Sequence, residues 1–178
     1  CVCEDFEKGS GFSEHSFLDN DGGAYMSDFF DIDYVPHEIG HQMGANHTFS
    51  QSTEGAGVNV EPGSGTTIMG YAGITGSNDV QDHSDPYFNY HSIRQILDNV
   101  ENSPNNCWTS TTITNNPPIA DAGNDHTIPQ GTAFVLRGAA TDADGSDVLT
   151  YTWEQIDNGL TTSSNFGPTK TTGGLWRS

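Results

Sequence analysis

Residues 37–47 constrain this chain more than any other stretch, because they read H-E-x-x-H-x-x-G-x-x-H without a departure. On a helix, residues four apart lie on one face, so His37 and His41 can present two imidazoles to one ion. Gly44 can adopt a positive φ, which ends the helix and turns the chain, so that His47 returns as a third ligand. Three neutral imidazoles with one open position suit a catalytic zinc ion. The sequence therefore predicts a helix that carries a zinc site.

Glu38 follows the first predicted ligand directly, so it can lie beside the metal without coordinating it. We expect it to take a proton from the water bound to the metal. A bare H-E-x-x-H occurs by chance in many chains, so alone it would not decide between a catalytic site and a chance match. The added glycine and third histidine at fixed spacing favour the zinc-hydrolase interpretation.

The extended motif resembles the zinc signature of the metzincin metallopeptidases, which also carry a methionine turn downstream. Residues 66–71, T-T-I-M-G-Y, match that turn and place Met69 22 residues after His47. The resemblance implies that Met69 lies beneath the histidines as an apolar floor; an ordinary core methionine is the alternative. The segments 48–50 and 85–88 are similar to reprolysin-like peptidases secreted by bacteria, although Thr48 stands where eukaryotic reprolysins usually have Asp.

The resemblance also implies a role for Tyr71, two residues after Met69. In astacin-like and serralysin-like metzincins a tyrosine at that offset contacts the zinc or the reaction intermediate, so a phenol here could donate a hydrogen bond to the oxyanion. A tyrosine packed in the turn is the alternative. Residues 72–86 would form the wall of the pocket for the substrate side chain after the scissile bond.

The charge of the chain excludes some partners. Five Lys and Arg stand against 24 Asp and Glu, a formal net charge of −19, which argues against nucleic acid or an anionic membrane as a partner. There is no run of 18 apolar residues, so we expect no membrane insertion. The Gly-rich, loop-rich composition is typical of secreted domains. We expect a secreted, extracellular protein that acts as a monomer on a protein or peptide substrate.

The three cysteines permit one disulfide and leave one thiol over. Cys1 and Cys3 are too close in sequence to be natural partners, so either could pair with Cys107. The reprolysin resemblance favours a disulfide between Cys3 and Cys107. Three free thiols in a reducing compartment are the alternative.

Helix signals surround the motif. Asp33 is the expected N-cap of the zinc helix, Pro36 lies in its first turn, and Ile39 and Met43 mark the side expected to be buried. Residues 48–68 read as a loop, in which the acids Glu54 and Glu61 are expected to be solvated rather than bound to calcium. Apolar residues at helical spacing predict a helix from Tyr87 to about Glu101.

The predicted domains are 1–109, a metzincin catalytic domain, and 119–178, joined by a Ser/Thr/Asn/Pro linker at 110–118. Only 36 residues precede His37, fewer than a metzincin upper sheet requires, so we expect the catalytic domain to be truncated at its N-terminus. An edge strand is expected at 11–17.

Residues 119–178 resemble the polycystic-kidney-disease-type immunoglobulin-like modules of secreted bacterial enzymes. We expect strands at 132–138 and 149–155, with Trp153 buried in the core of a β-sandwich. Such a sandwich needs about 80 to 100 residues, so this module is also expected to be truncated. The acids Asp142, Asp144 and Asp147 could hold calcium, although a polar turn is the simpler interpretation.

The predicted fold class is α+β, a metzincin-type fragment with an active-site helix, a methionine turn and a C-terminal helix, followed by a partial all-β sandwich. The predicted function is a secreted zinc metalloendopeptidase with His37, His41 and His47 as ligands and Glu38 as general base. We do not expect activity from the chain alone. One alternative is an inert surface- or carbohydrate-binding adhesin with a remnant protease fold. The other is a calcium-stabilised β-module.

Overall fold

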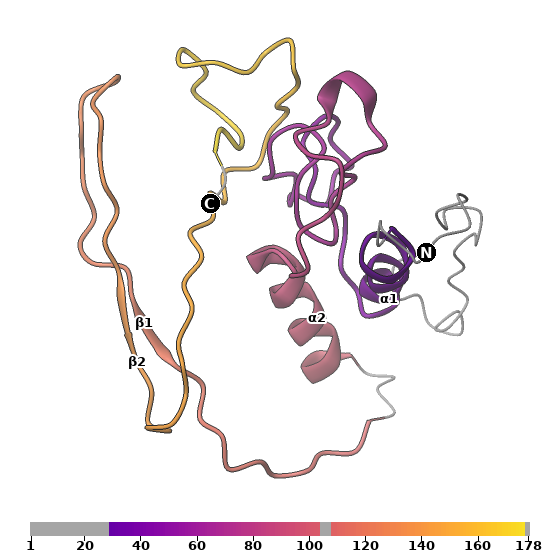
Figure 1. Ribbon diagram of the computed structural model, residues 1–178, viewed down its shortest axis with the longest axis vertical. Helices are drawn as coiled ribbons and strands as arrows, with labels where there is room; N and C mark the ends of the chain where they lie inside the picture. The colour runs from indigo at the N-terminus through magenta and orange to yellow at the C-terminus, as the bar shows by residue number, and fades with distance from the viewer. Residues whose placement is uncertain (1–28, 104–107, 177–178) are drawn as a thin grey trace, which may run out of the picture. The chain divides into compact units, whose positions relative to one another are not determined.

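The computed structural model describes residues 29–103 and 108–176 (Figure 1). The chain forms two compact units, one of Cys1–Trp108 with Trp153–Ser178 and the other of Thr109–Thr152. The predicted division into domains at 110–118 stays a prediction. The edge strand predicted at 11–17 lies outside the described residues. Within the described part of the chain, no helix has the length and apolar character that crossing a bilayer requires.

The motif helix starts differently from the prediction. A π-helical turn, η2 (Phe29–Tyr34), runs directly into α1 (Val35–Gln42), and Pro36 lies in the first turn of α1 as expected. The prediction that Asp33 caps this helix is wrong, because Tyr34 is the residue that precedes α1 and no side-chain hydrogen bond caps the helix. The backbone is already helical before Val35, so no set of free amides is left at Asp33 to cap. Its carboxylate instead accepts hydrogen bonds from the amide of Ser84 at 2.5 Å and from Nδ1 of His83 at 3.0 Å.

The end of α1 depends on Gly44. Met43 follows the helix, and Gly44 has φ +102°, which residues with a side chain rarely adopt. The amide of Gly44 donates to the carbonyl of His41 at 3.0 Å, and that of Ala45 donates to the carbonyl of Gly40 at 2.9 Å. The chain turns back at this point, which places the residues after Ala45 beside the helix they have just left.

The core beneath α1 consists of Ala45, Ile68 and Met69, with Phe88 and Ile96 packed against it. The prediction that Ile39 and Met43 mark the buried side of α1 is wrong: Ile39 is 51% exposed and Met43 36% exposed. The buried side is the one that carries His37 and Gly40, because Met69 packs there.

Segment 48–70 is held by hydrogen bonds rather than by regular elements. The amide of Thr48 donates to the carbonyl of Met69 at 3.0 Å, which joins the residue after the third histidine to the methionine turn. Glu61 was expected to be solvated, and this is wrong, because it is only 6% exposed. Its carboxylate accepts hydrogen bonds from Thr48, Thr66 and Thr67.

Helix α2 (Tyr90–Asn102) lies where a helix from Tyr87 to Glu101 was predicted, but it begins three residues later. Asn89 is its N-cap, and the side chain of Asn89 accepts a hydrogen bond from the amide of His91. The helix contacts the end of α1 through polar groups. The side-chain amide of Asn99 donates to the carbonyl of Met43 at 3.0 Å, and the oxygen of Gln95 accepts from the amide of Asn46 at 2.9 Å.

Residues 153–176 are part of the first unit and pack against its segment 50–63. The amide of Thr161 donates to the carbonyl of Ser50 at 2.7 Å, and the amide of Gly63 donates to the carbonyl of Thr161 at 3.0 Å. The strand predicted at 149–155 is wrong, since these residues are irregular. Trp153 is half-buried among residues of the first unit rather than enclosed in a β-sandwich.

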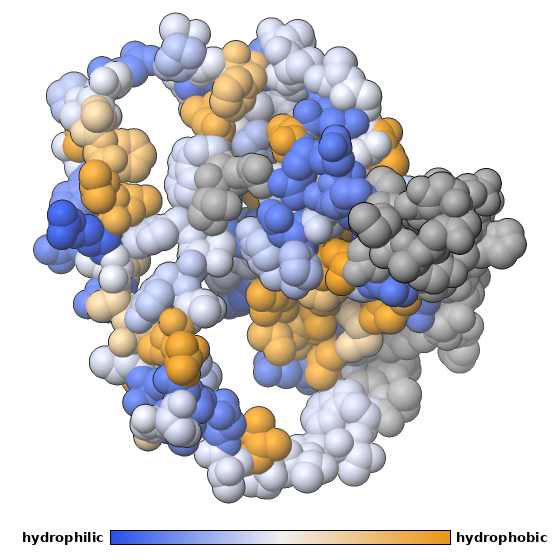
Figure 2. Space-filling model, in the orientation of Figure 1, coloured by the Kyte–Doolittle hydropathy of each residue, from blue (hydrophilic) through white to orange (hydrophobic). Residues whose placement is uncertain are grey.

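The second unit contains one antiparallel pair, β1 (Ile119–Asp121) with β2 (Ala139–Thr141), in which Ala120 faces Ala140. The strand predicted at 132–138 is wrong. Val135 in that stretch is 78% exposed, because the described residues of the unit provide no second sheet for it to pack on. Figure 2 shows hydrophobic surface along this unit. The immunoglobulin-like sandwich is therefore not confirmed.

Candidate metal centre

The three histidines of the motif meet at their Nε2 atoms. Nε2 of His47 lies 3.0 Å from Nε2 of His41 and 3.2 Å from Nε2 of His37. Helix α1 supplies two of the rings from one face, and the turn at Gly44 brings the third back to them. One nitrogen from each ring lies within 4.8 Å of the other two, a grouping able to hold a metal ion.

The outer nitrogen of each ring faces an oxygen. Nδ1 of His37 lies 2.7 Å from the carbonyl oxygen of Ile68, and Nδ1 of His41 lies 2.8 Å from that of Ala45. Nδ1 of His47 lies 2.7 Å from Oε2 of Glu54. Carbonyl and carboxylate oxygens only accept hydrogen bonds, so each Nδ1 carries a proton and donates. In the neutral rings every Nε2 therefore presents a lone pair, and the three lone pairs point at one another.

This arrangement fits a zinc ion. Three acceptor nitrogens about 3 Å apart repel one another unless a cation lies among them. Nitrogen ligands at about 2.0–2.1 Å around a tetrahedral ion are separated by roughly 3.3 Å. The two observed separations, 3.0 and 3.2 Å, are close to that value. The donor set of three imidazoles, each with an outer hydrogen bond, is that of a zinc site with an open position.

The surroundings keep His37 and His41 neutral, as metal binding requires. Burial, followed by the charge of a protonated His41, lowers the pKa of His37 to about 3. Burial likewise lowers the pKa of His41. His37 is 6% exposed, so a proton on its ring would be poorly solvated.

Two aromatic rings fix the position of His47. Phe49 stacks on it with ring centroids 5.0 Å apart and planes at 25°, and Tyr71 meets it edge-on at 4.5 Å. Tyr71 also lies 5.6 Å from the ring of His37. Burial, followed by the charges of Glu54 and Glu38, raises the pKa of Tyr71, so its phenol keeps its proton. The sequence predicted a role at the site for Tyr71, whereas Phe49 was marked only as part of the segment 48–50 that is similar to reprolysin-like peptidases.

Glu38 and His37 line a cavity of about 130 Å³. The other residues around this cavity come from η2, the methionine turn and the segment after it: Asp33, Tyr34, Gly70, Tyr71, Ala72, Ile74 and Ser84. Three of them lie in the segment 72–86, for which a pocket wall was predicted. The cavity thus joins the carboxylate of Glu38, the phenol of Tyr71 and one of the three histidines, His37, in one place.

Met69 lies directly under α1. It is fully buried, and a Cβ placed on Gly40, between the first two histidines, would overlap its sulfur atom. The carbonyl of the preceding residue, Ile68, is the acceptor for His37. The methionine turn therefore contacts the helix through an apolar side chain and holds one ligand through its backbone.

Sequence reasoning missed the role of two acids. Glu54 contacts a histidine, and buried Glu61 binds the methionine turn, although both were expected to be solvated loop residues. Neither contact has a spacing signal, because both form across irregular backbone. Cys3 and Cys107, for which a disulfide was predicted, lie outside the described residues, as does Cys1.

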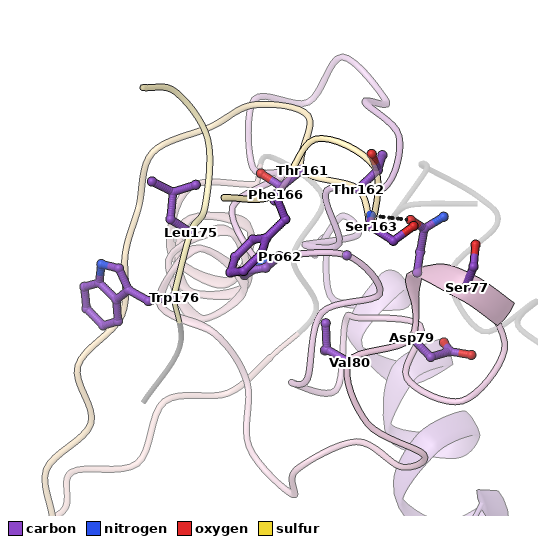
Figure 3. Close-up of a pocket in the computed structure, with 12 residues that line it drawn as sticks. Pro62, Ser77, Asp79, Val80, Thr161, Thr162, Ser163, Phe166, Leu175 and Trp176 are labelled. Atoms are coloured by element: carbon purple, nitrogen blue, oxygen red, sulfur yellow. Dashed lines mark hydrogen bonds between the residues drawn. The ribbon is translucent and has the colours of Figure 1, made fainter. Parts of the chain in front are cut away.

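Two other features lie away from the histidines. A larger hollow of about 430 Å³ is bordered by Pro62, Val80, Phe166, Leu175 and Trp176 (Figure 3). In the second unit, the carboxylates of Asp142, Asp144 and Asp147 lie within 4.8 Å of one another. Calcium binding by these acids stays a prediction.

Comparison with protein families matches residues 1–100 to the model described as metallopeptidase family M12B, reprolysin-like. The matched range contains all three histidines, Glu38, Met69 and Tyr71. Comparison with curated proteins and with solved structures gave no match.

Proposed function

The chain belongs to the reprolysin-like metallopeptidases of family M12B, and we propose that it is the zinc-binding part of a secreted endopeptidase that uses Glu38 as its general base. The observation that carries the proposal is the convergence of three Nε2 lone pairs, one of them from His37, which lines a cavity together with Glu38. His37, His41 and His47 would hold the ion. A bound zinc ion supplies Lewis acidity, which polarises the scissile carbonyl and acidifies a water molecule.

The protein's own groups perform the proton transfers. Glu38 faces the cavity, where it accepts a proton from the attacking water and then delivers that proton to the leaving amine. Tyr71 keeps its phenolic proton because its pKa is raised, so it can donate a hydrogen bond to the oxyanion of the carbonyl under attack. The cavity beside Ala72 and Ile74 would receive the substrate side chain after the scissile bond.

Composition supports the remaining parts of the proposal. The acidic, loop-rich chain is typical of extracellular domains, and a net charge of −19 disfavours polyanionic partners. We propose a protein or peptide substrate, an extracellular location and a monomer. An immunoglobulin-like module of the polycystic-kidney-disease type after residue 118, with calcium as a possible second ion, also remains a proposal.

The test replaces Glu38 with Gln in a form of the enzyme that cleaves casein. We expect the variant to bind zinc as the unmodified chain does and to lose casein cleavage by roughly 10²-fold or more, since the amide cannot accept the proton. Zinc content is measured alongside cleavage. Cleavage that a chelator abolishes and zinc restores would exclude the inert adhesin and the calcium-stabilised β-module. Near-normal cleavage by Glu38→Gln would refute Glu38 as the base.

A further inference from the structure

The third histidine is held differently from the other two. His37 and His41 lie on α1 and donate from Nδ1 to main-chain carbonyls. His47 lies beyond the helix, and its Nδ1 contacts a side chain, the carboxylate of Glu54, at 2.7 Å. The side chain of His47 is 15% exposed and that of Glu54 is 41% exposed, so the acceptor of this ring is itself open to solvent.

We propose that Glu54 is a positioning residue for the metal: it fixes the tautomer and orientation of His47 so that Nε2 is the ligand atom. This inference deepens the proposed zinc peptidase function and rests on it. A carboxylate that accepts the outer N–H of a ligating histidine also raises the basicity of the ligand nitrogen. Without Glu54, the ring could carry its proton on Nε2, which cannot then bind a cation.

The local backbone is built to hold Glu54 at the ring. The loop around it is exposed and contains Gly55 and Gly57, both with positive φ. The amide of Glu54 nevertheless donates to the side-chain oxygen of Asn59 at 3.1 Å. Asn59 is 1% exposed, and its side-chain amide donates in turn to the carbonyl of Phe49 at 2.7 Å. Asn59 thus ties the base of the loop to the segment that carries the third histidine.

The neighbouring rings complement this contact. Phe49 stacks on one face of His47, and Tyr71 meets it edge-on, so both restrict the ring without contributing an acceptor to Nδ1. Glu54 is the group that distinguishes the two nitrogens of the ring. Removal of the Glu54 carboxylate would therefore affect the tautomer and orientation of His47 more than it affects the packing around the ring.

The experiment compares the full chain with Glu54→Ala and Glu54→Gln, and with Glu101→Gln as the matched control. Glu101 is an exposed acid on α2, so this control makes the same change of charge away from the histidines. Zinc dissociation constants are measured by competition with a chromophoric chelator. The visible absorption spectrum of the cobalt-substituted proteins reports ligand geometry, and thermal unfolding of the metal-free proteins reports the fold.

We expect Glu54→Ala to weaken zinc binding roughly 10- to 100-fold and to alter the cobalt spectrum. Glu54→Gln should weaken binding less, because its amide oxygen still accepts from Nδ1, and Glu101→Gln should bind as the unmodified chain does. Metal-free melting temperatures should be equal throughout, since Glu54 lies in an exposed loop.

Tight zinc binding by both the unmodified chain and Glu54→Ala, with affinities within about twofold, would overturn this inference and leave the proposed function standing. No zinc binding by the unmodified chain would overturn both. Equal losses of zinc affinity in Glu54→Ala and Glu54→Gln, together with lower melting temperatures of the metal-free variants, would show that Glu54 stabilises the fold. That result would overturn its positioning role.

Discussion

Replacement of buried Glu61 should separate the effect of its charge from that of its shape. Oε1 accepts from the amides of Thr66 at 2.9 Å and Thr67 at 3.0 Å, while Oε2 accepts from the hydroxyl of Thr67 at 2.6 Å and from that of Thr48. The two oxygens of Glu61 thus face different groups: backbone amides at Oε1, which can only donate hydrogen bonds, and hydroxyls at Oε2, which can also accept them. Glu61→Ala removes both acceptors, and Glu61→Gln removes only one.

The expected magnitudes follow from this difference. In Glu61→Ala the two amides lose their acceptor inside the protein, at about 1–3 kcal/mol each, and we expect a loss of about 3–5 kcal/mol in the free energy of unfolding. In Glu61→Gln the side-chain oxygen still serves both amides, and the new NH₂ group donates to the two hydroxyls. The loss should then be about 1–2 kcal/mol, the difference between a charged and a neutral acceptor.

Urea unfolding of the metal-free proteins measures both losses, with exposed Glu101→Ala as the control that should change stability by less than about 0.5 kcal/mol. Zinc affinity should fall in the same order, because the segment that Glu61 organises also carries Ile68, the acceptor for His37. A Glu61→Ala protein as stable as the unmodified one would refute the reasoning. Equal losses for Ala and Gln would show that charge, and not acceptor geometry, holds the turn.

Three further predictions concern the site itself. Gly40→Ala should lower the melting temperature. The overlap of the new Cβ with Met69 costs about 1–3 kcal/mol, which outweighs the roughly 1 kcal/mol gain in helix propensity. An unchanged or higher melting temperature would contradict this packing. Tyr71→Phe should reduce peptide cleavage roughly 10²-fold at unchanged zinc affinity, whereas equal cleavage would leave Tyr71 a packing residue. The pKa of His37 is lowered from 6.5 to about 3, so the unfolded chain binds a proton between these values that the native chain does not. Stability of the metal-free chain should therefore fall as pH drops through this window, by up to about 1.4 kcal/mol per pH unit, and His37→Gln should flatten the dependence measured by urea unfolding at each pH.

The sequence predicted those parts of the site that depend on local geometry. The spacing of His37 and His41 follows from the period of a helix, and the turn at Gly44 follows from the freedom of glycine. These are properties of a few consecutive residues. The same kind of reasoning placed α2 to within a few residues, since its apolar residues repeat at helical spacing.

Predictions that needed knowledge of the neighbours did worse. Ile39 and Met43 are apolar and four apart, yet they are exposed, because the partner of α1 is Met69 on another side of the helix. Period-two alternation at 132–138 gave no strand, since alternation creates a sheet face only where another layer covers it. Asp33 has the chemistry of a helix cap, but the helical backbone of η2 continues through it.

The outer contacts of the histidines explain why the motif reaches beyond the ligands. Two of the three rings are oriented by main-chain carbonyls, at Ala45 and at Ile68, and a carbonyl leaves no mark in a sequence because every residue has one. The sequence does record the residues that set these carbonyls in place. Gly44 has a positive φ and directly precedes Ala45, and the buried side chain of Met69 anchors the turn that contains Ile68. The glycine and the methionine of the pattern are therefore markers of backbone acceptors for His41 and His37. Because His47 has a carboxylate in place of such a carbonyl, the position of its acceptor depends on a loop that no comparable marker identifies.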